Sequence, residues 1–119
     1  MAAKNTDKMQ KQNSSEFPQE VKEAVAEIGG LDRILNAVKP EEIEQEVKLH
    51  KILSDKTRLT ILKAIQQCDL CPCVIKVLIK ISDSRLSYHL MVLEEAGLIA
   101  SYKKKNWKIY QITEKGRSL

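Results

Sequence analysis

The chain has 119 residues, a common size for one domain, and 43% of them are apolar but only 4% are aromatic. Its formal charge is +4 and its pI is near 9.0, a mild basic bias that suits contact with nucleic acid. No apolar run approaches the length that crosses a bilayer, and the N-terminus lacks an apolar signal segment. These features argue against a membrane protein and predict a cytoplasmic protein with a mainly aliphatic core.

The N-terminal part of the chain is predicted to be a tail followed by helices. Residues 1–16 are polar and show no periodicity, so we expect a disordered tail. A first helix is predicted from Pro18 to Gly29, and a second short helix lies before Pro40, which can itself start a third. Residues 20–46 carry eight acidic side chains against three basic ones.

Two further helices are predicted after this acidic segment. Ser54 or Asp55 can cap the first of them, because both side chains can accept a hydrogen bond from the first turn. The second is short, begins after Asp69 or Cys71, and has Pro72 in its first turn. The residues that we expect to face the interior from this short helix are Val74, Val77 and Leu78.

A last long helix is predicted to start at Ser82 or Asp83 and to end at Gly97. Its leucines recur at the i, i+4, i+7 spacing of one buried helical face. The period then changes to that of two short strands, residues 98–102 and 107–112, around a lysine-rich tip. The leucines of the buried face are Leu86, Leu90 and Leu93, and the tip is Lys103, Lys104, Lys105 and Asn106.

The order short helix, tight turn, helix and basic hairpin predicts a winged helix-turn-helix, which is mainly α with a small β-hairpin. In this fold the second helix enters the major groove with its N-terminal residues, and the hairpin contacts the DNA backbone. We therefore predict that the chain binds double-stranded DNA. The candidate contact residues are Ser82, Asp83, Ser84, Arg85, Ser87, Tyr88 and His89 on the helix, and Lys103, Lys104, Lys105 and Lys108 on the hairpin.

All three cysteines of the chain lie within six residues, as Cys68, Cys71 and Cys73. Thiolates are soft ligands, so three that converge suit a trigonal acceptor such as arsenite. Tetrahedral zinc or cadmium needs one more ligand, from the N-terminal tail, His50 or a partner subunit. A helix N-terminus at Cys71 and Cys73 would favour the thiolate form. Two alternatives stay open: a disulfide-forming redox switch, and cysteines that only fill space.

Residues 50–113 resemble the ArsR/SmtB family of metal-sensing winged-helix repressors. The resemblance covers just over half of the chain, and its thiol motif is that of the thiolate-sensing, arsenic-repressor-like branch. Lys76 and Lys80 depart from the small residues usual in that family. The stretches that carry the resemblance are residues 53–62, Leu70-Cys-Pro-Cys73, residues 82–90, residues 92–99 and residues 107–112.

The resemblance implies a homodimeric transcriptional repressor and not an enzyme. Such a repressor leaves its operator DNA when the cysteine cluster, Cys68, Cys71 and Cys73, binds a soft metal or a metalloid. It has no permanent cofactor, and its effector is expected to be As(III) or another thiophilic metal ion. Residues 17–119 would form one domain in which the helices of about residues 17–50 supply the dimer contacts. The alternatives are a thiol-based redox regulator and a winged-helix module that binds protein without sensing an effector.

Overall fold

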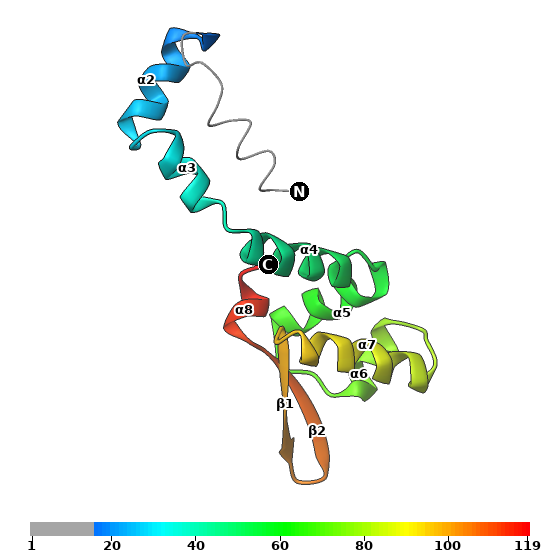
Figure 1. The fold of residues 1–119 in the computed structure, drawn as a ribbon. Coiled ribbons are helices and arrows are strands. Elements are labelled where there is room, and N and C mark those ends of the chain that lie inside the picture. Colours follow the sequence, from blue (N-terminus) through cyan, green and yellow to red (C-terminus); the bar gives the residue numbers. More distant parts are fainter. Residues whose placement is uncertain (1–15) are drawn as a thin grey trace. The chain divides into compact units, whose positions relative to one another are not determined.

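The computed structural model describes residues 16–119, so the predicted disordered tail lies outside the described residues except for Glu16. The chain divides into two compact units (Figure 1). One unit extends to Val47, and the second comprises Lys48–Leu119. Each unit has its own elements and is described by itself.

The first unit consists of α2 (Gln19–Glu27), α3 (Leu31–Ala37) and the first turns of α4 (Pro40–Leu53). These are the three helices that the sequence predicts. Pro18 stands at the N-cap of α2, where its fixed φ suits the start of a helix. Gly30 has a φ of +91°, which glycine adopts without steric strain because it has no Cβ. The chain can therefore turn here between α2 and α3. No side chain of these described helices is fully buried.

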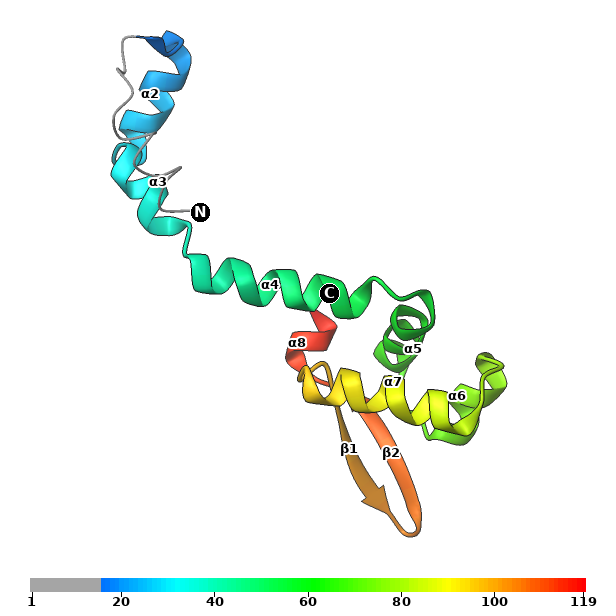
Figure 2. The ribbon, with the colours of Figure 1, turned by 45° about the vertical axis from the view of Figure 1, so that its right-hand side comes forward.

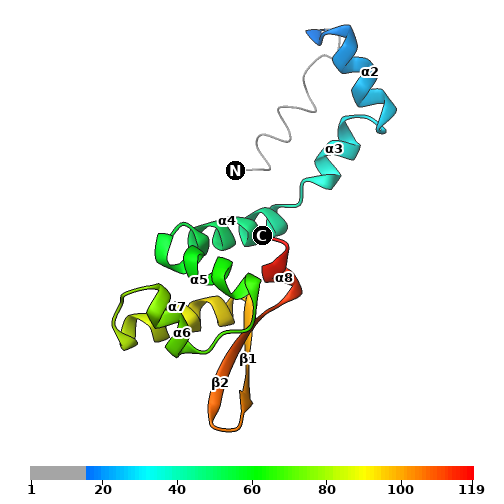
Figure 3. The same ribbon diagram turned by 180° about the vertical axis from the view of Figure 1, so that it is seen from behind.

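The second unit contains α5 (Lys56–Gln67), α6 (Pro72–Leu78) and α7 (Asp83–Glu95), then β1 (Ile99–Lys104), β2 (Trp107–Ile112) and α8 (Glu114–Arg117). The hairpin of β1 and β2 projects from this group of helices, as Figure 2 and the reverse view in Figure 3 both show. This is the predicted winged helix-turn-helix, in which α6 and α7 form the helix-turn-helix and the hairpin is the wing. Among residues 16–119 there is no helix with both the length and the apolar character needed to cross a bilayer.

The core of the second unit is aliphatic, as the scarcity of aromatic residues predicts. Helix α7 contributes the predicted leucine stripe, and β1, β2 and the short α6 close the core from other sides. The buried residues are Ile61, Leu62, Ile65, Ile75, Leu86, Leu90, Leu93, Leu98, Ile99 and Tyr110.

The prediction that Val74, Val77 and Leu78 face the interior from α6 is wrong. Ile75 is the fully buried residue of this helix, whereas Val77 is 78% exposed and Leu78 is 60% exposed. Val74 is 42% exposed. A helix of only seven residues has two turns, so one side chain can point to the core while its neighbours remain at the surface.

The wing is a regular antiparallel ladder that runs from Ile99↔Ile112 to Lys104↔Trp107. Its turn is narrower than the predicted tip, because Lys103 and Lys104 belong to β1 and the turn consists of Lys105 and Asn106. Lys105 adopts a φ of +57°, the left-handed conformation that tight hairpin turns use.

One more segment pairs with the wing. Leu70 and Tyr110 form an isolated antiparallel bridge, in which each backbone N–H donates to the other residue's carbonyl at 3.0 and 2.8 Å. The loop that precedes α6 is therefore attached to β2.

Candidate nucleic-acid interface and thiol pair

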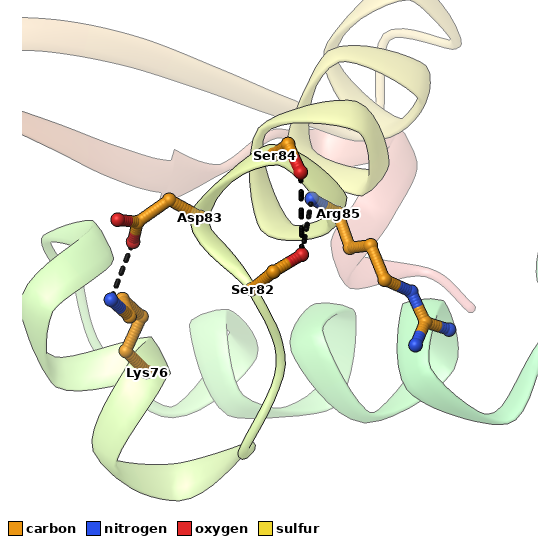
Figure 4. A network of polar contacts seen from close by, with 5 residues as sticks. All are labelled: Lys76, Ser82, Asp83, Ser84 and Arg85. Carbon is orange, nitrogen blue, oxygen red and sulfur yellow. Dashed lines mark hydrogen bonds and ion pairs between the residues drawn. The ribbon is translucent and has the colours of Figure 1, made fainter.

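The N-terminus of α7 is built by a side-chain cap. Ser82 is the N-cap, and its Oγ accepts a hydrogen bond from the Arg85 backbone N–H at 3.3 Å. The same Oγ lies 3.3 Å from the Ser84 Oγ (Figure 4). This cap fixes the first turn of α7 and presents its polar side chains outward. The residues predicted to contact DNA that are exposed there are Ser82, Asp83, Ser84, Arg85, Ser87 and Tyr88.

Arg85 and Asp83 differ in their electrostatic surroundings. Asp83 Oδ1 pairs with Lys76 Nζ at 2.5 Å, which links α6 to α7 (Figure 4). Within the described part of the chain no carboxylate pairs with the Arg85 guanidinium, and Figure 4 shows its side chain extended away from the Lys76–Asp83 pair. Arg85 is thus available for a phosphate or a guanine edge, while the Asp83 carboxylate already has a cationic partner in Lys76.

His89 does not belong to this outer surface, contrary to the sequence prediction. It is only 6% exposed, on the same face of α7 as the buried leucines. Arg58 Nε donates to His89 Nδ1 at 3.4 Å, and Arg58 Nη1 donates to the Ile52 carbonyl at 2.9 Å. The Arg58 guanidinium also lies 5.8 Å from the centroid of the Tyr88 ring. Burial prevents His89 from contacting DNA, and its partner Arg58 joins the end of α4 to α7.

The sequence did not reveal that Arg58 binds His89. The spacing of His89, in contrast, does indicate that this residue is buried. His89 lies three residues after Leu86 and one before Leu90, which places it on the apolar face. No periodicity marks Arg58 as the partner of His89, because the two residues lie 31 positions apart in the sequence.

The wing carries the four predicted lysines on its exposed outer half. Lys103 and Lys108 are direct cross-strand partners, so two like charges lie side by side on one face. Lys108 Nζ also lies 5.3 Å from the Tyr110 ring centroid. Such a concentration of positive charge at the end of a hairpin favours an anionic partner. The other two lysines are Lys104, in β1, and Lys105, in the turn.

The three cysteines do not converge on one centre. Cys71 is the N-cap of α6, and a disulfide joins it to Cys73 across a Cα–Cα distance of 5.4 Å. Cys68 is a free, exposed thiol at the C-cap of α5. Within residues 16–119 no three His, Cys, Asp or Glu side chains lie together as a metal site. The structure therefore brings together Cys71 and Cys73, and it leaves Cys68 outside the pair.

An open groove of 430 Å³ adjoins the thiol pair. It is lined by Cys71, Cys73 and Val74 at the start of α6 and by Trp107 and Ile109 of β2. Leu70 and Asp69, in the loop before α6, complete the lining. The Tyr102 hydroxyl donates to Asp69 Oδ2 at 2.8 Å, which holds this loop against the wing and raises the pKa of Tyr102.

Residues 55–101 match the family model described as "Bacterial regulatory protein, arsR family". The arsenical resistance operon repressor of Bacillus subtilis is 30% identical over 81 residues, which are 67% of this chain and 77% of that protein. A relative from Halobacterium salinarum that carries the name ArsR is 34% identical over 79 residues, and the match spans 65% of this chain but only 61% of that protein.

A solved structure shows the same fold. HlyU from Vibrio cholerae superposes with a TM-score of 0.62 at 23% identity, over 67% of this chain and 88% of that one.

Proposed function

The chain belongs to the arsR family of bacterial regulatory proteins, and from this premise we propose that it is a transcriptional repressor that binds double-stranded operator DNA in the cytoplasm. The family is one of transcriptional regulators and not of enzymes, as the sequence predicted. The observation that carries the proposal is the exposed, capped N-terminus of α7 on the same unit as a lysine-rich wing. In this fold these are the two elements that reach the major groove and the DNA backbone.

Each side chain of the proposed interface has a distinct task. Arg85 has no ion pair within residues 16–119 and can give a bidentate contact to guanine or to phosphate. The hydroxyls of Ser84, Ser87 and Tyr88 donate to phosphates, which fix the position of α7 in the groove. The lysines of the wing supply charge to the backbone without reading sequence. Asp83 keeps a supporting role, because Lys76 holds its carboxylate.

The proposed effector is trivalent arsenic or another thiophilic ion, bound by Cys71 and Cys73 in their reduced form. Two observations support this. The relative from Bacillus subtilis is named for the arsenical resistance operon, and the two sulfur atoms are close enough to bond to each other. Two thiols at this separation can both reach one soft atom after small side-chain rotations.

The contacts of α6 provide a route from the thiol pair to the DNA-binding elements. Capture of an ion at Cys71 and Cys73 would distort the first turn of α6. The Lys76–Asp83 pair would transmit that change to the first turn of α7. The Leu70–Tyr110 bridge would transmit it to the wing. A coupling free energy of about 1–3 kcal/mol is enough to change DNA affinity by roughly one to two orders of magnitude.

The decisive experiment measures DNA affinity with and without effector. Fluorescence anisotropy with a duplex selected by the protein from a random pool would be recorded for the reduced wild type, Cys71→Ser and Arg85→Ala. We expect arsenite to release the wild type, and Cys71→Ser to stay bound with its basal affinity unchanged. Arg85→Ala should weaken basal binding by about 1–3 kcal/mol, because it removes one direct contact. An arsenite response that survives in Cys71→Ser would refute the effector site.

A redox regulator is the second candidate, and the observed disulfide between Cys71 and Cys73 favours it. Oxidation would draw the two side chains together and act on α6 as an ion would. Peroxide in the absence of arsenite separates the two candidates: release of DNA by peroxide alone supports the redox switch.

We also propose a homodimer in which the N-terminal helices supply contacts. Exposed apolar side chains recur along them, and Ile43 and Val47 lie four residues apart on α4, at 47% and 49% exposure. A two-fold dimer suits a palindromic operator with half-sites about one helical turn apart.

A further inference from the structure

The groove beside the thiol pair offers an apolar surface in addition to its two sulfur ligands. Its other walls are mainly apolar, with Trp107 and Ile109 on the wing and Val74 on α6. Its one acidic side chain, Asp69, already accepts the Tyr102 hydroxyl. A ligand held by the sulfur atoms would therefore have its remaining substituent against hydrocarbon and an indole ring.

Trivalent arsenic forms three bonds, and the reduced pair supplies two of them. The third thiol of the chain, Cys68, does not line the groove, and no cluster of three potential ligands exists within residues 16–119. The third substituent must then come with the ligand. An apolar substituent fits the groove better than a hydroxyl group, since the surface beside it has few hydrogen-bonding partners to offer.

We propose that the reduced Cys71–Cys73 pair binds a monosubstituted organic arsenical, R–As(OH)₂, with its carbon group R packed in the groove against Trp107. The inference rests on the proposed function, because it names the effector of the same thiol pair. It differs from a three-thiolate site for inorganic arsenite in needing only two cysteines and an apolar wall.

The chemistry balances in two steps. A monothiol reductant first opens the disulfide: two equivalents become one external disulfide, and the protein gains two thiols. The arsenical then exchanges both hydroxyl groups for the two sulfur atoms. Two As–O and two S–H bonds break, two As–S bonds form, and the protons leave as two water molecules. Arsenic remains trivalent, so the capture itself needs no oxidant or reductant.

Trp107 provides the measurement, because it is the single tryptophan of the chain and lines the groove. Reduced protein would be titrated with phenylarsine oxide, which hydrates to the R–As(OH)₂ form, and in parallel with arsenite, while Trp107 fluorescence is recorded. We expect the phenyl compound to bind about 10–100-fold more tightly, since it buries an aromatic ring that arsenite lacks.

Matched variants locate the effect. Cys68→Ser should retain tight binding of the phenyl compound and Cys71→Ser should lose it. Val74→Asp places a charge in the groove wall and should remove the preference for the phenyl compound while arsenite binding remains. Val77→Asp is the control, because Val77 is 78% exposed on the same helix and does not line the groove. Circular dichroism would establish that both aspartate variants are folded.

The outcomes separate this inference from the proposed function. Equal affinity for the two arsenicals, with DNA still released by arsenite, would overturn the inference alone. Tight phenylarsine oxide binding that leaves labelled DNA bound would support the inference and refute arsenical-dependent repression. Loss of the preference in Val77→Asp to the same extent as in Val74→Asp would also overturn the groove as the site.

Discussion

At the scale of single residues, Arg58 connects three parts of the second unit. Its backbone N–H donates to the Asp55 carboxylate at 2.9 Å, and its guanidinium reaches the Ile52 carbonyl and His89. The hydrogen bond from the Arg58 backbone N–H is the main cause that lowers the pKa of Asp55 below its ordinary value of 3.8, against a smaller opposing effect of desolvation. The charges of His89 and Arg58 lower it further.

This lowered pKa predicts an acid-dependent contribution to stability. The folded state holds the Asp55 proton less tightly than the unfolded state, so the stabilisation is complete above pH 3.8 and is lost as pH falls through the lower folded pKa. Asp55→Asn keeps a good N-cap but cannot titrate. We expect the free energy of unfolding of wild type to fall more steeply below pH 3.8 than that of Asp55→Asn, measured by urea titration. Parallel curves for the two proteins would contradict this.

At the scale of elements, the stability of α7 depends on its first turn. Ser82 supplies the cap, and the Lys76–Asp83 pair adds an acidic residue near the positive end of the helix. The exposed polar side chains that we propose for DNA contact follow directly after the cap. The Ser82 cap therefore both stabilises α7 and positions these exposed side chains.

Ser82→Ala should destabilise the protein by about 1 kcal/mol, because it leaves the Arg85 backbone N–H without its side-chain acceptor. Ser87→Ala is the matched control: it removes an exposed hydroxyl from the middle of the same helix, where alanine is the better helix former. Its stability should be unchanged or slightly higher. Chemical denaturation of both variants checks the difference, and equal destabilisation would argue against the cap.

The sequence predicted those elements whose signals are local. Pro18, Pro40 and Pro72 mark helix starts, and the leucine stripe of α7 identifies its buried face. The face of α6 was not predictable in this way, because a helix of seven residues is too short for periodicity to fix its orientation.

Helix α8 was missed for a different reason. It has four residues, and it is fixed by distant contacts: Gln66 Nε2 donates to the Gly116 carbonyl at 2.9 Å. A Cβ on Gly116 would lie 2.1 Å from the Leu98 carbonyl oxygen, so this glycine allows a close approach that no local pattern reveals. In the candidate site, the exposed face of α7 was predictable, but the separation of Cys68 from the other cysteines depends on the break between α5 and α6.

At the scale of the whole molecule, charge and apolar surface are distributed unequally along the chain. Residues 20–46 carry eight acidic side chains against three basic, whereas residues 103–119 carry six basic against one acidic. The acidic segment would repel DNA, and it also bears the exposed apolar residues of α4. This combination supports the use of the N-terminal helices for subunit contacts and of the wing for DNA.

The proposed dimer predicts that Val47→Glu produces monomers at concentrations where wild type is dimeric. A charge in an apolar interface carries a desolvation cost that the monomer avoids. Gln45→Glu introduces the same charge at an exposed polar position of α4 and should leave the dimer intact. Sedimentation velocity measures both variants. Dimers of Val47→Glu with wild-type stability would place the interface elsewhere.

The isolation of Cys68 has a practical consequence. While Cys71 and Cys73 are joined to each other, the chain presents a single reactive sulfur atom, at the exposed end of α5. A maleimide dye added without reductant would therefore label each polypeptide once, at a position outside both the wing and α7. On oxidation in air, two polypeptides would become cross-linked by a disulfide between their Cys68 side chains.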